Sequence, residues 1–160
     1  MNVNVTSAVI GVAVLATGAL VYVVDRAPEL SLVGSTVSFF HLKLTAFGAI
    51  GQNLPSFAHV FAFSLLTIAL LGGGRRAAIA VCSGWLFVNA AFELGQHPTI
   101  ATKLAHLTPT WFEGIPILHR TNDFFLAGTF DAFDLVAMAL GALTAYWVMQ
   151  RTQLRGTNHD

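Results

Sequence analysis

Two aspartates open the last apolar run of the chain. Asp131 and Asp134 lie three residues apart near the start of Gly128 to Gln150, so on a helix they share one face and differ in depth by about 4.5 Å. The run after them carries no charge before Arg151, which predicts a membrane-spanning helix. A carboxylate one turn inside such a helix costs on the order of 1 to 3 kcal/mol unless it faces a polar partner. A simpler interpretation makes Asp131 the cap of the first-turn amides and Asp134 the acidic partner of that cap.

Further polar side chains lie near the ends of two other apolar runs. His59 falls one turn into a run that begins at Pro55, where a lone histidine is either a packing residue or a ligand. Glu93 lies one turn from the end of the next run, on one face with Asn89 and Gln96. Asn89 and Gln96 also fit a role as hydrogen-bonding contacts between helices. An ionisable group such as Glu93 is costly in lipid and therefore indicates function.

These side chains are compatible with several kinds of site. His59 with Glu93 or Asp134 could act as a general base, or with both could hold a metal ion. The sequence has no nucleophile motif, phosphate-binding glycine loop or histidine-rich metal spacing, which argues against an enzyme. We therefore expect no catalytic residue, metal or cofactor, and a site that binds a membrane lipid or a lipid-linked or amphipathic molecule through His59, Glu93, Gln96, Asp131 and Asp134. A cluster that only fixes helix register is the alternative, and a proton-coupled carrier is less favoured because the chain has no internal repeat.

The composition is that of an integral membrane protein. The 160 residues are 55% hydrophobic and only 10% charged, and their number suits a single domain. Lys and Arg equal Asp and Glu at 8 each, so no basic surface is available for nucleic acid. The single cysteine, Cys82, excludes an internal disulfide and a cysteine-based zinc site, and its apolar neighbours predict a buried packing role.

Four apolar runs predict an all-α membrane protein with four transmembrane helices, at about residues 7–24, 55–71, 77–96 and 131–149. A cleaved signal peptide is the alternative for the first run, but no Lys or Arg precedes it and it exceeds the usual length. Alternating short and long connections place the two long loops, 27–53 and 97–130, together on the outer side. Both termini and the Arg75-Arg76 turn then share the other side, and their short basic segments favour the cytoplasm.

The two long loops carry local patterns of their own. Residues Phe40 to Thr45 alternate as in a strand that would pair with Ile115 to Phe125, although an interfacial helix fits nearly as well. The spacing of apolar residues predicts a short helix over Ile100 to Leu107. Trp111 and Phe112 suit a position at the membrane surface.

The predicted depths of the polar residues agree with one another. His59 would lie about 6 Å below the outer boundary, and Glu93 and Asp134 about one turn inside it. Random polar substitutions would scatter through the bilayer, so agreement among three separate helices predicts one polar cluster in the outer leaflet.

Three of the four spans resemble one known family. The stretch LPSFAHVFAFSLLTIALL resembles the second span of VanZ-like membrane proteins, FELGQ resembles their Glu-x-x-Gln ending of the third, and FDAFDLVAMALGALTA is similar to their fourth. The resemblance implies a small cell-envelope protein with a link to glycopeptide antibiotic resistance. It also implies shared polar positions at His59, Glu93, Gln96 and Asp134. Family members usually carry an arginine shortly before the aspartate, where this chain has Gly128-Thr129-Phe130.

Overall fold

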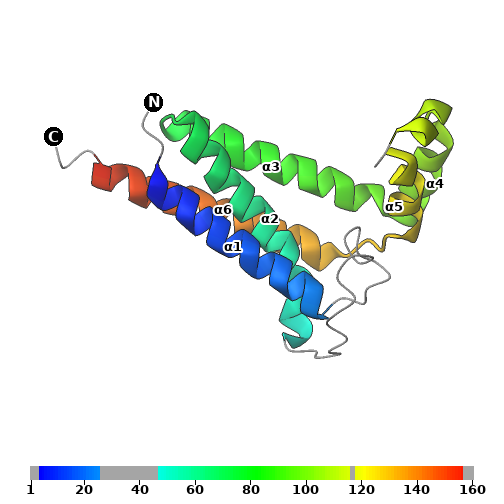
Figure 1. Cartoon of the computed structure of the whole chain (residues 1–160), viewed down its shortest axis with the longest axis horizontal. Helices are drawn as coiled ribbons and strands as arrows, with labels where there is room; N and C mark the ends of the chain where they lie inside the picture. The colour runs from blue at the N-terminus through cyan, green and yellow to red at the C-terminus, as the bar shows by residue number, and fades with distance from the viewer. Residues whose placement is uncertain (1–3, 26–46, 116–117, 157–160) are drawn as a thin grey trace.

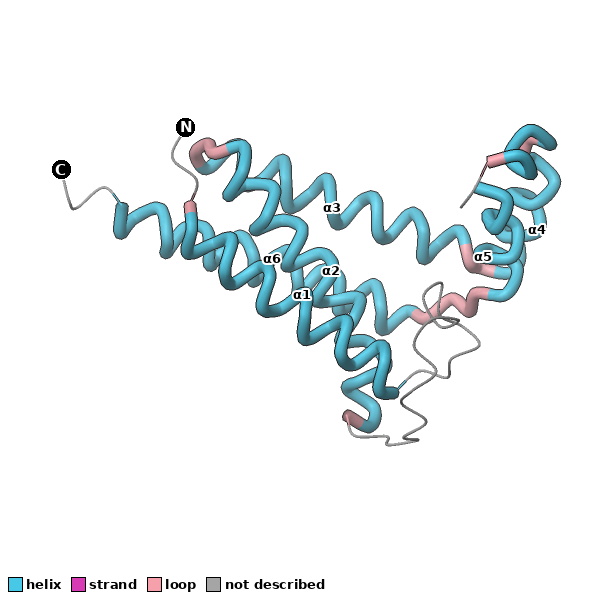
Figure 2. The backbone as a smooth tube through the Cα atoms, in the orientation of Figure 1, coloured by secondary structure: helices cyan, strands magenta, loops and turns pink. Residues whose placement is uncertain are grey.

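The computed structural model describes residues 4–25, 47–115 and 118–156, and all of its regular elements are helices (Figure 1). Within these ranges no strand is present, as Figure 2 shows, which confirms the predicted all-α class. The four long helices are α1 (Val5–Asp25), α2 (Gly48–Leu71), α3 (Arg75–Gly95) and α6 (Ala132–Gly156). The short ones are α4 (Pro98–Leu107), η2 (Thr110–Gly114), η3 (Leu118–Arg120) and α5 (Thr121–Ala127).

Three of the long helices are long and apolar enough to cross a membrane. Their apolar segments are Ile50–Leu71 in α2, Arg75–Gly95 in α3 and Ala132–Thr152 in α6. The described apolar part of α1, Val5–Val21, is shorter. The structure is therefore compatible with a membrane-embedded protein, as the composition predicted.

Helix α2 is the centre of the bundle, with α1 and α6 both packed along it. Its buried side chains recur at helical spacing and include Val60, Phe61, Leu65 and Ile68. Helix α6 adds Met138, Ala142, Ala145 and Met149 to this core, and α3 adds Ala78 and Cys82. The burial of Cys82 confirms its predicted packing role.

Glycines let the helices approach α2 closely. A Cβ atom at Gly141 of α6 would lie 2.6 Å from the carbonyl oxygen of Phe57, so the two backbones are nearly in contact there. On an adjacent face of α2, a Cβ atom at Gly18 of α1 would lie 2.7 Å from the Cβ of Ala58. In lipid, helix association depends on such close van der Waals packing, because apolar side chains gain little by leaving lipid for a protein interior.

Helix α3 stands further from the centre than its neighbours. It leaves the tight turn after α2, diverges from α2 along its length and ends beside the start of α6 (Figure 1). Its exposed side chains include Ile79, Phe87, Val88, Phe92 and Leu94. An apolar surface of this kind suits contact with lipid.

Helix α2 begins seven residues earlier than its predicted start at Pro55. Pro55 is buried inside the helix rather than in its first turn. Prolines are tolerated inside transmembrane helices where neighbouring groups satisfy the freed backbone. The earlier start adds Asn53 to the helix and shifts His59 deeper along it. The other predicted ends differ from the observed ones by a few residues, except that α6 continues to Gly156.

The predicted loop structures have mixed outcomes. The short helix predicted over Ile100 to Leu107 is confirmed by α4. The suggested strand over Ile115 to Phe125 is wrong, because η3 and α5 occupy its described part. Phe124 and Phe125 both contact the ring of Phe92, which a helical turn permits and a strand would prevent by sending neighbours to opposite faces. The alternating residues Phe40 to Thr45 lie outside the described ranges.

We expect Gly141→Ala to destabilise the protein by about 1 to 3 kcal/mol, since the added methyl group would force α6 away from α2. Gly84→Ala is the matched control, because a Cβ atom there meets nothing within 4 Å. The control should be neutral or slightly stabilising, as alanine favours helix over glycine. Reversible unfolding in mixed micelles measures both, and equal stability of the two variants would contradict the close α2–α6 contact.

Candidate functional site

Three carboxylates meet where α3 ends and α6 begins. The Oε1 atom of Glu93 accepts a hydrogen bond from the backbone amide of Asp131 at 2.6 Å. The amide nitrogen of Asn53 on α2 donates to Asp131 Oδ2 at 3.2 Å and to Asp134 Oδ1 at 2.9 Å. We call these four residues, Asn53, Glu93, Asp131 and Asp134, the carboxylate cluster. The structure thus brings together three of the five residues predicted to bind.

Asp131 also has the capping role of the simpler interpretation. Its Oδ1 atom accepts the backbone amide of Phe133 at 2.8 Å, in the first turn of α6. Asp134 is not the reciprocal partner of this cap, because the amide of Asp131 is bound by Glu93 from another helix. Asp134 turns instead toward Asn53. The backbone amides at the start of α6 are therefore bound both by Asp131 and by Glu93 of α3. These two hydrogen bonds link the end of α3 to the start of α6.

The cluster is largely shielded from solvent. Glu93 and Asp134 are each only 8% exposed. The described donors to the two aspartates are the Asn53 side chain and the Phe133 backbone amide, and both are neutral. Within the described part of the chain, Asp134 Oδ2 accepts no hydrogen bond. A carboxylate oxygen accepts hydrogen bonds, so this oxygen is suited to an amine or another hydrogen-bond donor.

Asn53 is the member of the cluster that the sequence interpretation missed. The predicted second span began after it, so Asn53 was assigned to a loop. A signal was present, because Asn53 lies six residues before His59 and two before Pro55 in a segment that contains no charge. Extending the helix backward through the proline would have placed this amide near the predicted depth of Asp134.

His59 lies at a different depth from the carboxylate cluster. It is six residues after Asn53 on α2, which corresponds to about 9 Å along the helix axis. Its ring stacks on Phe63 at 5.8 Å, and Phe63 in turn stacks on Trp85 of α3 at 4.9 Å. The common slab predicted from the sequence therefore includes Glu93 and Asp134, but His59 lies deeper because α2 starts earlier.

The remaining polar residues of α3 differ in their roles. Gln96 packs against Gly128, where a Cβ atom would collide with the glutamine side chain. The ring of His97 meets Phe130 edge-on at 5.4 Å. Both contacts attach the end of α3 to the segment that precedes α6. Asn89 instead donates to the carbonyl oxygen of Trp85 in its own helix, at 2.8 Å.

The described residues contain no group of three or more His, Cys, Asp or Glu side chains arranged to hold a metal ion. The cluster is better suited to hydrogen-bond donors than to metal coordination, since it already binds an amide group between two aspartates. The carboxylate cluster is therefore a site rich in hydrogen-bond acceptors at one end of an apolar helix bundle.

Asn53→Ala should destabilise the protein by about 1 to 3 kcal/mol, because it removes the described donor shared by Asp131 and Asp134. Asn89→Ala is the matched control and should cost less than about 1 kcal/mol, since its bond lies within one helix. Adding Asp134→Asn to Asn53→Ala should recover part of the loss, because fewer acceptors remain unmatched. Equal losses for the two alanine variants, measured by unfolding in micelles, would argue against the bridging role.

No protein-family model matches the chain, and no curated protein or solved structure matches it either. The resemblance of three spans to VanZ-like proteins therefore stays a prediction made from their residues. The function of the chain has to be inferred from the geometry of the carboxylate cluster and of the helices around it.

Proposed function

We propose that this protein is a VanZ-like, multi-pass protein of the cell envelope that binds a lipid-linked or amphipathic molecule through the carboxylate cluster. Gln96 at the rim and His59 deeper along α2 belong to the proposed site as predicted from the sequence. The link to glycopeptide antibiotic resistance rests on the resemblance alone. In this proposal the protein is a binding protein and not an enzyme.

One observation supports the proposal most strongly. Asp131 and Asp134 both accept from the neutral Asn53 side chain, and Glu93 accepts from the Asp131 backbone amide, in a bundle whose other side chains are largely apolar. Such a concentration of carboxylates is costly beside lipid and is stabilised by proton or hydrogen-bond donors. The preferred ligand therefore has a head group that carries an amine or several hydroxyl donors, and an apolar part compatible with the surrounding helices.

The same proposal includes four spans. Helix α1 has 21 residues, which gives a length of about 31 Å and matches the hydrocarbon thickness of a bilayer. It packs along α2, whose apolar segment is long enough to cross. The start of α1, the end of α6 and the α2–α3 turn lie at one end of the bundle (Figure 1). With Arg75, Arg76 and Arg151 at that end, we propose that it is cytoplasmic and that the carboxylate cluster faces the outer leaflet.

A structural role is the second candidate, and one observation favours it. The Glu93 carboxylate binds the first free amide at the α6 start, and Asn53 holds both aspartates, so the cluster joins three helix ends. A membrane protein can use such contacts solely to fix helix register. The two candidates predict different effects of substitutions that remove a charge but keep the hydrogen-bonding capacity.

Glu93→Gln and Asp134→Asn should each leave the fold intact and reduce a co-purifying lipid or amphipathic ligand by at least about tenfold, since a charged contact contributes about 1.5 to 3 kcal/mol. Native mass spectrometry after purification in mild detergent measures ligand occupancy. Asp123→Asn is the matched control, because this exposed carboxylate lies on α5 outside the cluster. Full occupancy in the Glu93→Gln, Asp134→Asn double variant would leave the structural role as the better account.

Topology supplies an independent test. Reporter fusions at Gly73 and after residue 156 should both report the cytoplasm, and a fusion at Thr108 should report the outside, because four spans return the chain to its starting side. A Gly73 fusion on the cytoplasmic side with an external amino terminus would show that α1 does not span. An external carboxyl terminus would instead place the cluster in the inner leaflet.

A further inference from the structure

The segment between α3 and α6 forms a compact helical cap made of α4, η2, η3 and α5. Its connection to the bundle is short at both ends. Only Gln96 and His97 separate α3 from α4, and only residues 128–131 separate α5 from α6. Since α3 and α6 are both long and apolar enough to cross a membrane, each end of the cap must lie close to the level at which these helices leave it.

The cap runs across the end of α3 and does not continue the axis of that helix. Figures 1 and 2 show α4 and α5 standing beside the end of α3, on the side away from α1. The joint is defined by aromatic packing. Phe92 of α3 contacts Phe124 and Phe125 of α5, and the ring of Phe125 covers Gly95 so closely that a Cβ atom there would lie 2.5 Å from it. The cap is therefore held across the end of α3.

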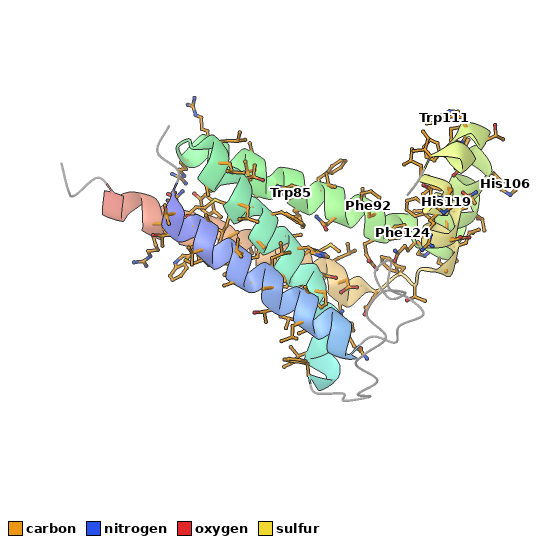
Figure 3. All side chains as sticks on the ribbon, viewed as in Figure 1. Trp85, Phe92, His106, Trp111, His119 and Phe124 are labelled. Atoms are coloured by element: carbon orange, nitrogen blue, oxygen red, sulfur yellow. The ribbon has the colours of Figure 1, made fainter. Side chains whose placement is uncertain are left out.

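The two sides of the cap differ in polarity. Figure 3 places Trp111 on the side toward α3 and His106 on the far side. The apolar side chains that the cap exposes are large: Leu107 is 75% exposed, Trp111 61% and Leu126 54%. On α4, Leu107 shares a face with Ile100 and Leu104, whereas His106 shares the opposite face with Thr99 and Thr102.

The exposed apolar surface of α3 continues into the cap. Phe87, Phe92 and Leu94 are exposed on the outer part of α3, and Phe92 lies at the joint with α5. A surface that meets lipid along α3 would therefore meet the same bilayer on the adjoining side of the cap. Trp at this level is the side chain that favours the membrane boundary, with an apolar ring and a polar N–H group.

We propose that the cap is an interfacial membrane-binding element whose Leu107 and Trp111 side inserts among the lipid head groups and upper acyl chains of the adjoining leaflet. His106 and the polar face of α4 then remain in water, as in amphipathic helices that lie in the plane of a membrane. This position of the cap requires that α3 and α6 cross the bilayer, and it does not depend on what the carboxylate cluster binds.

Site-directed spin labelling in phospholipid nanodiscs tests the position of the cap. In a Cys82→Ala background, Leu107→Cys and His106→Cys each provide one labelling site, and the two neighbouring residues lie about 100° apart around the axis of α4. The nitroxide at 107 should be relaxed mainly by oxygen, which concentrates in lipid, and the one at 106 mainly by a water-soluble nickel chelate. The oxygen-to-nickel accessibility ratio should be severalfold higher at 107.

Dominant relaxation by nickel at both positions would overturn the proposal, because it places both faces of α4 in water. Strong spin–spin broadening at 107 would overturn it too, since it assigns this face to a second copy of the chain. If the spin-labelled variants do not fold, the fluorescence of Trp111 in an unlabelled protein provides a second test of insertion. With Trp85→Phe and Trp147→Phe, the emission of Trp111 should be quenched by phosphatidylcholine with brominated acyl chains and protected from iodide, and the reverse pattern would contradict insertion.

Discussion

The hydrogen-bond network around Asn53 is the constraint on which one end of the bundle depends, where α3 ends and α6 begins. Carboxylates near the ends of membrane helices must find donors, because lipid offers none. Asn53 supplies one amide group to two aspartates, and Glu93 satisfies the backbone amide of Asp131. The ends of α2, α3 and α6 are thereby fixed at a common level of the bundle. The same arrangement leaves acceptor capacity on Asp134 Oδ2, so the atoms that join the helix ends are also those of the proposed ligand site.

Packing along α2 determines where this network can form. Gly18 and Gly141 allow α1 and α6 to approach α2 on adjacent faces, and the approach at Gly141 is nearly backbone to backbone. Gly141 lies seven residues after Asp134, about two turns along one face of α6, so this contact also sets the position of Asp134 relative to α2. Helix α3 is joined to α2 by the Gly72–Gly74 turn and by the stacking of Trp85 on Phe63, and its far end is held by the carboxylate cluster.

Much of the fold could be predicted from composition and periodicity, because long apolar runs have few alternatives in a membrane protein. Glu93, Asp131 and Asp134 could be grouped from their depth alone, since each lies within a turn of a helix end. Asn53 could not be grouped with them, because Pro55 was interpreted as a first-turn proline. The seven residues before it were therefore left out of the predicted helix. The same late predicted start of α2 placed His59 too close to the beginning of the helix. The cap was predicted only in part, since the contacts of Phe124 and Phe125 with Phe92 depend on the tertiary position of α3.

The cap and the carboxylate cluster are mechanically connected. Asp131 lies four residues beyond the end of α5, and the backbone between them packs on Gln96 and His97 through Gly128 and Phe130. A displacement of the cap relative to α3 therefore pulls on the Asp131 amide that Glu93 accepts. If the cap is anchored at the membrane surface as proposed, that anchoring would help to hold this amide in place and thereby the spacing of the acidic groups. In the proposed function, a ligand that brings its own donor to Asp134 would act on the same backbone segment from the other side.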